Sequence, residues 1–436
     1  MCVLTHIYDA CVRAPLHSRV VVVVWRVLAD FRSYRRLFYA QVVALAGTGL
    51  ATVALALLAY DLAPGRAGQV VGTALTIKML AYVGAGPLLT AALARAPRRA
   101  VLVGSDAVRA LAVACLPLVD QVWQVYVLIA VLQCASAAFT PTFQAVIPEL
   151  VDDRGYTSAL ALSRLAYDLE ALASPLLAAL LLVLVPFDGL FALTALGFTV
   201  SGVLVATTAL PARSPASQSP RRAAASWRVF ATDRRLMALM ALNMAVAVAT
   251  ALVLVDTVVF VRSHLGGTDT GVALMLACFG AGSMLVALAL GALVDRFGTR
   301  ALMLTGPAVA TAGAAATVLG WTLAPGPAVL GAGWAVLGAG WAVLGAGCAL
   351  VSAPTGRLLR EAAPEGALAG VFAAQFALSH ACFLLTYPLA GWAGNLDPIL
   401  LLGGAGTLTG MCALAAAGLW RPSPVAADRA ATVEDR

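Results

Sequence analysis

The sequence contains few charged residues. Asp, Glu, Lys and Arg make up 11% of its 436 residues, whereas hydrophobic residues make up 61%. Soluble globular domains carry about 25% charged residues, so this chain has too few to cover itself with a surface that faces water. A lipid bilayer removes that requirement. The composition therefore predicts an integral membrane protein without a large soluble domain.

Several chemical motifs are also missing. The eight cysteines show no CxxC or Cys/His spacing, so neither a disulfide framework nor a zinc site is indicated. There is no G-x-x-x-x-G-K-[ST] loop for ATP, and the four histidines form no metal-binding pair on one helix. Basic residues are not interleaved with aromatic ones, as they are in proteins that bind single strands. We therefore expect no cofactor, no bound metal, no nucleic-acid partner and no enzymatic activity.

Long apolar runs dominate what is present. A helix needs about 20 mostly apolar residues to cross a bilayer, and twelve runs meet this length. They lie near residues 37–60, 69–92, 100–119, 122–146, 157–184, 187–209, 236–261, 270–293, 300–323, 327–353, 367–391 and 398–420. The short run at 20–24 is flanked by arginines and precedes no cleavage site, so no signal peptide is predicted. We expect residues 1–30 to be a cytoplasmic tail, in part an artefact of an upstream start codon.

The basic residues orient these spans. Cytoplasmic loops of membrane proteins carry an excess of Lys and Arg. With a cytoplasmic N-terminus, 23 of the 28 basic residues fall in inner segments and two, Arg66 and Arg262, in outer loops. The remaining three, Lys78, Arg109 and Arg164, lie within spans. This asymmetry predicts a multi-pass protein of the cytoplasmic (inner) membrane with both termini inside.

One long polar segment divides the chain. Residues 210–235 are rich in Pro, Ser and Arg, which is typical of a flexible linker. We therefore predict an all-α fold of two six-helix bundles at 37–209 and 236–420, with tails at 1–36 and 421–436. Transporters built from such repeats place their site where the halves meet. We expect a monomer that contacts membrane lipids.

A tandem repeat lies in the second half. Ala-Val-Leu-Gly-Ala-Gly occurs at 328–333, 335–340 and 342–347. Seven residues make about two helical turns, so the repeat lengthens a helix and keeps its faces. Its glycines could form a packing seam between helices. We favour the alternative, a short tandem duplication that is absorbed by helix tilt.

A charged loop motif carries a family resemblance. The string G-x-x-x-D-R-x-G-x-R falls after the eighth span, at Gly291, Asp295, Arg296, Gly298 and Arg300. It resembles the loop signature of the major facilitator superfamily, which implies a gate that is remade during alternating access. Asp295 can pair with a cation or a helix N-terminus, and Arg296 and Arg300 can neutralise helix C-terminal carbonyls.

The matching loop of the first half keeps the basic residues Arg95, Arg98 and Arg99, but Thr90 and Ala94 replace the expected Gly and Asp. Further stretches extend the resemblance over about 37–420. Residues 139–150 and 105–109 look like the drug-efflux and siderophore-export branch, and Ser174-Pro175 is similar to the Gly-Pro kink of antiporters. The stretches at 162–170 and 375–380 look similar to exporters linked to nickel resistance.

Charged residues inside the spans are candidate functional groups, because each costs about 2.5–3.5 kcal/mol to bury in a membrane. Asp106 and Arg109 share a helix face, and we interpret them as a structural pair that supports the gate. Arg164 and Asp168 can also pair. Glu170 lies on the opposite face from Asp168 and about 20 Å deep.

Glu170 has no local partner, so we predict that it carries the coupling proton, with Asp168 as its neighbour. Alternatively, Glu170 pairs with a cation on another helix, such as Lys78. Asp256 lies near the outer end of its span and is interpreted as an exit-side or interfacial group. A polar set on the eleventh span is predicted to line the substrate cavity, or to bond between helices, and comprises Gln375, Ser379, His380 and Tyr387.

Together these features predict a secondary transporter of the major facilitator type. It would export a small molecule, drug-like or a siderophore, in exchange for protons. The alternatives are efflux of a divalent metal such as nickel, and a receptor or scaffold on the same fold that does not transport.

Overall fold

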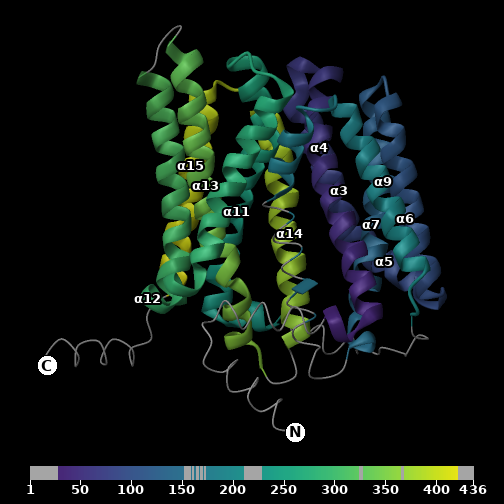
Figure 1. The fold of residues 1–436 in the computed structure, drawn as a ribbon. Coiled ribbons are helices and arrows are strands. Elements are labelled where there is room, and N and C mark those ends of the chain that lie inside the picture. The colour runs from purple at the N-terminus through teal and green to yellow at the C-terminus, as the bar shows by residue number, and fades with distance from the viewer. Residues whose placement is uncertain are drawn as a thin grey trace, which may run out of the picture. The chain divides into compact units, whose positions relative to one another are not determined.

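The computed structural model describes residues 28–151, 159, 162, 163, 166, 170, 173–210, 228–323, 328–364 and 368–420. Every regular element within these residues is a helix (Figure 1). Nine of the helices are long and apolar enough to cross a membrane. The prediction of an all-helical membrane fold is therefore confirmed for the described part of the chain.

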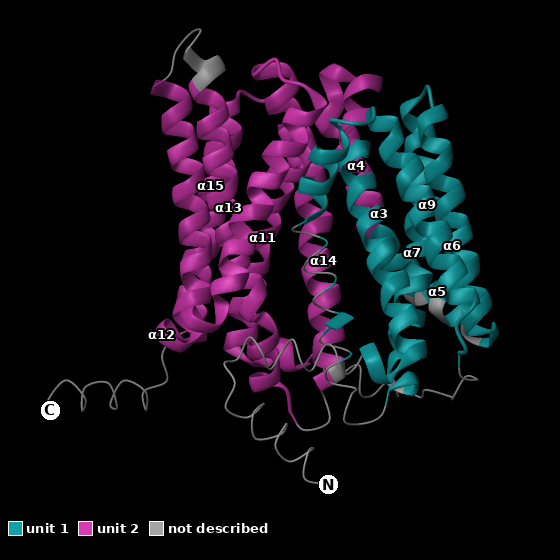
Figure 2. Cartoon of the chain, in the orientation of Figure 1, with its two compact units in different colours: residues 1–55, 80–215 teal, residues 56–79, 216–436 magenta. Residues whose placement is uncertain are grey.

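The chain divides into two compact units (Figure 2). Unit 1 comprises residues 1–55 and 80–215, and unit 2 comprises residues 56–79 and 216–436. The second boundary falls inside the segment 210–235, where the sequence predicts a linker. Residues 56–79 belong to unit 2, however, whereas the predicted division placed them in the first half. The predicted division into six-helix bundles stays a prediction.

Unit 1 is built from long helices that begin at N-capping or proline positions. Its main elements are α3 (Arg32–Leu62, of which residues 32–55 belong here), α5 (Gly86–Ala92), α6 (Arg98–Cys115), α7 (Val122–Leu150) and α9 (Phe187–Ala206). Gln121 and Gln124 form a capping box at the start of α7, which satisfies two backbone N–H groups that have no partner inside the helix. Aromatic and aliphatic side chains of α3, α6, α7 and α9 form the core of this unit.

The predicted second span is interrupted. It consists of α4 (Ala67–Leu80), the π-helical turn η2 (Ala81–Ala85) and α5. Pro87 lies at the start of α5 and has no backbone N–H to donate. A wide π-helical turn immediately before it accommodates the missing bond, and such turns are frequent at functional sites.

Unit 2 contains α4 up to Met79, α11 (Arg234–Val259), the π-helical turn η5 (Phe260–His264), α12 (Asp269–Leu323), α13 (Ala328–Ala362), α14 (Leu368–Ala393) and α15 (Pro398–Leu419). Asp233 caps α11 by accepting a hydrogen bond from the Arg235 backbone N–H at 2.8 Å. Asp397 caps α15 in the same way, with Pro398 in the first helical turn.

α12 is not one straight helix. Gly298 lies inside it with φ 75° and ψ 156°, a conformation that favours glycine and ends regular helical geometry. This glycine belongs to the loop motif at 291–300. The break therefore falls between the two apolar runs that the sequence predicts as separate spans.

The glycines of the tandem repeat form a close seam with α12. A Cβ atom added to Gly345 would lie 1.9 Å from the carbonyl oxygen of Phe279, and one added to Gly347 would lie 2.7 Å from that of Gly306. Only glycine allows backbones to approach so closely, which is the packing mode that membrane helices use. The structure thus supports a packing seam at these glycines, and a tandem duplication that is absorbed by helix tilt stays a prediction.

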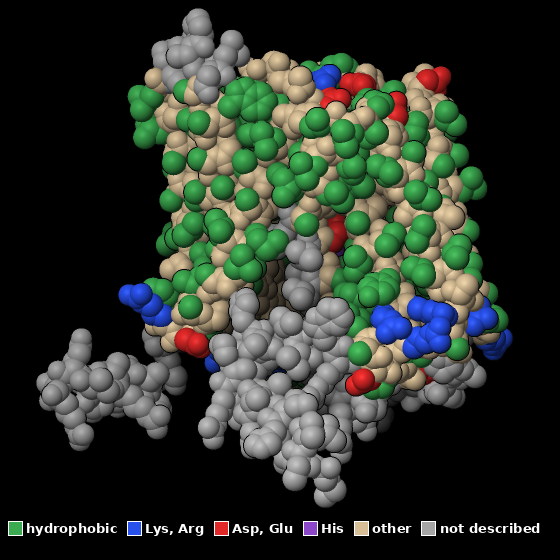
Figure 3. Space-filling view, viewed as in Figure 1, with side chains coloured by type: hydrophobic (Ala, Val, Ile, Leu, Met, Phe, Trp, Pro, Cys, Tyr) green, Lys and Arg blue, Asp and Glu red, His purple; other side chains and the backbone are tan. Residues whose placement is uncertain are grey.

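The outer surfaces carry many large apolar side chains, including Leu184, Leu285 and Leu414. Figure 3 shows hydrophobic side chains over much of the visible side face, with Lys and Arg gathered at one end of the unit 1 helices. Exposed leucines over whole helices would be unfavourable in water, whereas lipid tails solvate them. The chain is a multi-pass membrane protein.

Candidate functional site

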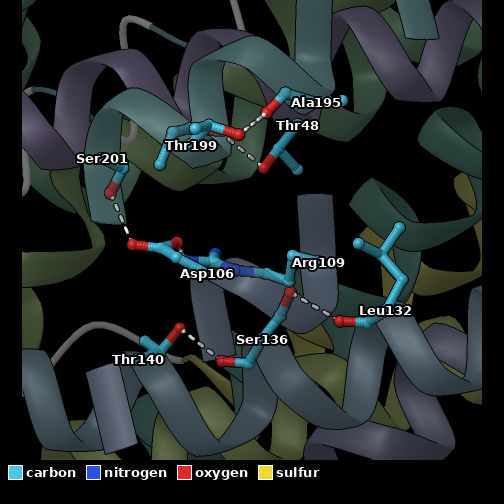
Figure 4. A network of polar contacts seen from close by, with 10 residues as sticks. Thr48, Asp106, Arg109, Leu132, Ser136, Thr140, Ala195, Thr199 and Ser201 are labelled. Atoms are coloured by element: carbon cyan, nitrogen blue, oxygen red, sulfur yellow. Dashed lines mark hydrogen bonds and ion pairs between the residues drawn. The ribbon is translucent and has the colours of Figure 1, made fainter. Parts of the chain in front are cut away.

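A charged network lies in the interior of unit 1, where α6 packs against α7 and α9 (Figure 4). Asp106 and Arg109 of α6 are 1% and 5% exposed and form an ion pair. Ser201 of α9 donates a hydrogen bond to the second carboxylate oxygen of Asp106 at 2.8 Å. The pair expected from the i,i+3 spacing is therefore present. Gly202 allows α9 to come close, since a Cβ there would lie 3.3 Å from the Asp106 Cβ.

Two aromatic rings hold the Arg109 side chain. Its guanidinium carbon lies 4.1 Å from the ring centre of Phe139 on α7 and 4.5 Å from that of Phe198 on α9. Aromatic faces attract a cation, and this attraction grows when water is excluded. The Arg109 Nε has no hydrogen-bond partner among the described residues. The pair thus joins three helices through one carboxylate and one guanidinium.

A second polar layer involves Tyr82 of η2. Its side chain hydrogen-bonds with Ser136 and Thr140 of α7 and interacts electrostatically with Arg109 and Glu170. The Ser136 and Thr140 hydroxyls donate to backbone carbonyls of their own helix, at 2.9 and 3.0 Å. The single Tyr82 O–H is therefore shared between two hydroxyls that can only accept from it. Tyr82 was not predicted, although it lies five residues before Pro87 in the same apolar run.

Glu170 is half-buried, and its carboxylate lies against Gly49 of α3. A Cβ added to Gly49 would lie 2.8 Å from the Glu170 Oε1. Glu170 takes part in polar or electrostatic interactions, as Lys78 does. The absence of a local partner on its own helix does not leave Glu170 without interactions, and its role in proton coupling stays a prediction. Arg164 and Asp168 lie outside the described residues.

Basic residues at one end of unit 1 join helix termini. Arg98 at the start of α6 forms a bidentate ion pair with Glu149 near the end of α7. Arg99 donates a hydrogen bond to the carbonyl oxygen of Thr208, just after α9, at 2.7 Å. Arg95 is exposed. The first-half loop therefore binds helix ends through its arginines even though it lacks the acidic residue of the motif, and the partner Glu149 was not predicted.

The loop motif of unit 2 has one ordered contact to another helix. Arg300 donates from Nε to the carbonyl oxygen of Trp420, at the C-terminal end of α15, at 2.8 Å. This is the neutralisation of a helix C-terminus that we predicted for Arg300. Asp295 and Arg296 are exposed, and Gly291 has open space around it. No ion pair of Asp295 occurs among the described residues.

The polar set on α14 does not converge on one point. Ser379 donates to the carbonyl oxygen of Phe376 at 3.0 Å, and the His380 Nδ1 lies 2.7 Å from the same oxygen. Tyr387 is buried and stacks on Phe383 at 5.2 Å. The Gln375 Oε1 is buried without a hydrogen-bond partner among the described residues. A cavity role for these residues stays a prediction.

Asp256 of α11 was interpreted as an exit-side or interfacial group. It is completely buried in the packed helices, and its depth in the membrane stays a prediction. Its apolar flanks, Leu-Val-Leu-Val before it and Thr-Val-Val after it, were a signal for burial. The part of the chain that the structure describes holds no group of three or more His, Cys, Asp or Glu residues that could bind a metal ion.

Apolar helices of membrane-spanning length, one buried ion pair inside them and arginine contacts at their ends are the features of a polytopic membrane protein. Residues 37–261 match the model of the Major Facilitator Superfamily. This match covers more than half of the chain, and the protein belongs to that superfamily.

Curated relatives match a shorter part. Macrolide efflux protein A of Streptococcus pyogenes is 25% identical over 166 residues, which is 37% of this chain and 41% of that protein. Macrolide efflux protein A of Enterococcus faecalis is 26% identical over 150 residues, or 32% of this chain and 46% of that protein. The chain thus spans less than half of the length of the curated relatives it matches.

Solved structures share the fold over nearly the whole chain. The nucleoside transporter NupG superposes with a TM-score of 0.68 at 13% identity, covering 89% of this chain and 100% of that one. A bacterial homologue of the iron transporter ferroportin, in an inward-facing state, gives 0.64 at 14% identity, with 89% and 98% covered. The D-xylose-proton symporter gives 0.62 at 16% identity, with 90% and 98% covered.

Proposed function

We propose that this protein is a secondary active transporter that exports a small drug-like solute from the cytoplasm by alternating access, in exchange for protons. The observation that carries the export of a drug-like compound is the similarity to macrolide efflux proteins. A siderophore is the second substrate class, in line with the sequence stretches at 139–150 and 105–109.

The proposed architecture has twelve spans in two bundles. Nine candidate spans lie among the described residues, and one of them, α12, has 55 residues and a break at Gly298. A helix of that length would extend about 80 Å, more than twice the thickness of a hydrocarbon core, so α12 supplies two spans. The interrupted segment 67–92 supplies another. The predicted fifth span, 157–184, is described only in part, at 159, 162, 163, 166, 170 and 173–184, and it would complete the count.

The orientation follows from the arginines. Contacts of Arg98, Arg99 and Arg300 with helix ends occur in segments that the sequence places inside. Anionic lipids of the inner leaflet attract such residues. We therefore propose a protein of the cytoplasmic membrane with both termini inside, which acts as a monomer.

Glu170 remains the proposed proton-coupling residue, now as a member of a polar layer with Tyr82 rather than as an isolated carboxylate. A coupling group has to exchange partners as access alternates, and an acid with partners on other helices meets this condition. The charged pair Asp106–Arg109 acts beside it as the element that holds α6, α7 and α9 together.

The test is drug accumulation in a susceptible strain with and without this protein, followed by flux into inverted vesicles under an imposed proton gradient. We expect resistance to at least one macrolide-like or siderophore-like compound, and flux that a protonophore abolishes. Glu170→Gln should retain binding but lose the pH dependence of flux, whereas Asp120→Asn, an exposed loop residue, should behave as wild type. Resistance only to nickel salts would favour metal efflux, and no flux of any compound would favour a scaffold.

A further inference from the structure

A junction of three helices in unit 2 encloses the Asp256 carboxylate. α4 and α14 meet there, and each helix contributes glycines to the contact. A Cβ added to Gly72 would lie 2.6 Å from the carbonyl oxygen of Tyr387, and one added to Gly391 would lie 2.6 Å from that of Gly68. The two backbones therefore touch, and no larger residue fits at either position without movement.

The side chain of Asp256 points from α11 into this glycine crossing. Its Oδ1 lies 3.3 Å from the Cβ position of Gly68 on α4 and 2.5 Å from that of Gly394, just after α14. Asp256 is 0% exposed, and neither carboxylate oxygen has a hydrogen-bond partner among the described residues. Thr257, the next residue, accepts a hydrogen bond from Trp341 of α13 at 2.7 Å, which fixes this part of α11.

Among the residues that the structure describes, no ion pair to the Asp256 carboxylate occurs. Around it, Arg262 of η5 is engaged by Asp269 and Asp61, and Lys78 lies about 15 Å along α4 from Gly68 and has interactions of its own. The other charged or titratable groups of the packed elements are Arg66 in η1, His264 in η5, His380 and Tyr387 in α14, Asp397 before α15, and Arg357, Arg360 and Glu361 near the C-terminal end of α13.

An ionised carboxylate without hydrogen bonds or a counter-charge is the least favourable group to enclose in an apolar interior, and such a group takes up a proton instead. We propose that Asp256 is a proton-binding site of this protein, and that the proton it holds permits the close packing of α4, α11 and α14. When the junction opens and water enters, the carboxyl group can release the proton. A lower proton concentration then favours the open junction.

This site is distinct from Glu170, which lies in unit 1. The protonation of Asp256 does not depend on the transported solute, but its use in coupling rests on the proposed function. Two protonatable groups in two units would let proton binding control the opening of each unit's helices in turn.

The experiment is infrared spectroscopy of the purified, reconstituted protein at neutral pH. The C=O stretch of a protonated carboxyl group should be present in wild type and reduced in Asp256→Asn, which keeps the shape of the side chain. Asp120→Asn, at an exposed loop, should leave the band unchanged. Identical spectra of wild type and Asp256→Asn would show that Asp256 is ionised and would overturn the proposal.

A second variant tests the link to packing. Gly394→Ala places a methyl group 2.5 Å from the carboxylate oxygen, so it should open the junction and reduce the protonated band at neutral pH. Gly403→Ala, where nothing lies within 4 Å, should have no effect. If Gly394→Ala leaves the band intact, the protonation of Asp256 does not depend on the close packing of the junction, and the proposed link between the two is overturned.

Should Asp256→Asn fail to fold, solid-state NMR of wild-type protein with ¹³C-labelled aspartate replaces it. A protonated aspartate signal at neutral pH is expected, and its absence overturns the proposal. These readouts need no transport, so a protein that shows them but moves no solute would refute the proposed function and leave this site standing.

Discussion

The Asp106–Arg109 pair offers a sharp energetic test, because the two partners should respond unequally to removal. Asp106→Ala leaves a guanidinium buried in unit 1 without its carboxylate, and arginine stays protonated. Breaking a buried pair in this way costs about 3–5 kcal/mol. The rings of Phe139 and Phe198 still face the cation and offset up to about 2 kcal/mol. With the full offset, a net loss of about 1–3 kcal/mol in the free energy of unfolding is expected.

Arg109→Leu should cost less. The remaining Asp106 keeps its hydrogen bond from Ser201, and a carboxyl group can become neutral by taking up a proton. The double variant Asp106→Ala, Arg109→Leu removes both charges, and apolar replacement of a buried pair is often neutral or stabilising. The double variant should therefore be more stable than Asp106→Ala alone, with a coupling free energy of about 2 kcal/mol.

Equilibrium unfolding in mixed micelles, titrated with a denaturing detergent, measures all three variants. The exposed pair Arg357–Glu361 is the control, and its double-mutant cycle should give no more than about 0.5 kcal/mol. If Asp106→Ala and the double variant are equally stable, the buried guanidinium carries no penalty and the reasoning fails.

Two further predictions concern the cap of α11 and the glycine seam. Partial burial raises the pKa of Asp233, but hydrogen bonds from Arg235 and the charge of Arg235 outweigh it and lower the pKa below its ordinary value. The stabilisation of the protein by the Asp233 carboxylate should therefore be present at neutral pH and lost as the pH falls through the folded-state pKa. Asp233→Ala should lower the free energy of unfolding by about 1 kcal/mol, and Asp233→Asn should lower it less, because Asn still caps the helix. Equal losses in the two variants would contradict this, as would a difference in melting temperature between wild type and Asp233→Ala that does not shrink in acid. Gly345→Ala should destabilise the protein by about 1–3 kcal/mol, because the added methyl group would meet the Phe279 carbonyl. Gly338→Ala is the control: it lies at the same repeat position, its nearest atom would be 3.4 Å away, and it should be tolerated. Equal thermal stability of the two variants would refute the seam.

Contacts between residues close in the sequence were predictable. Contacts between different helices were not, because they depend on how the helices pack. The spacing of Asp106 and Arg109 predicted their pairing, since residues three apart share a helix face. The position of Arg300 in a loop next to a helix end predicted its contact with a carbonyl group at a helix C-terminus. The motif glycine Gly298 lies where a helix has to end.

What could not be predicted depends on packing between helices. The burial of Asp256 results from the approach of α4 and α14, and glycines far away in the sequence permit this approach. Glu170 has interactions in the packed bundle that its neighbours on one helix do not indicate. The pairing of Arg98 with Glu149 joins residues 51 positions apart, and neither residue type nor spacing indicates such a partner.

Coupled flux in liposomes tests the central claim most directly. Purified protein is reconstituted alone, and movement of a labelled macrolide-like compound is recorded together with the internal pH. The account predicts that an imposed proton gradient drives the compound against its own gradient, and that adding the compound without a gradient moves protons in the opposite direction. Movement of neither species, with correctly folded protein in the membrane and a panel of compounds and metal salts supplied, would contradict it.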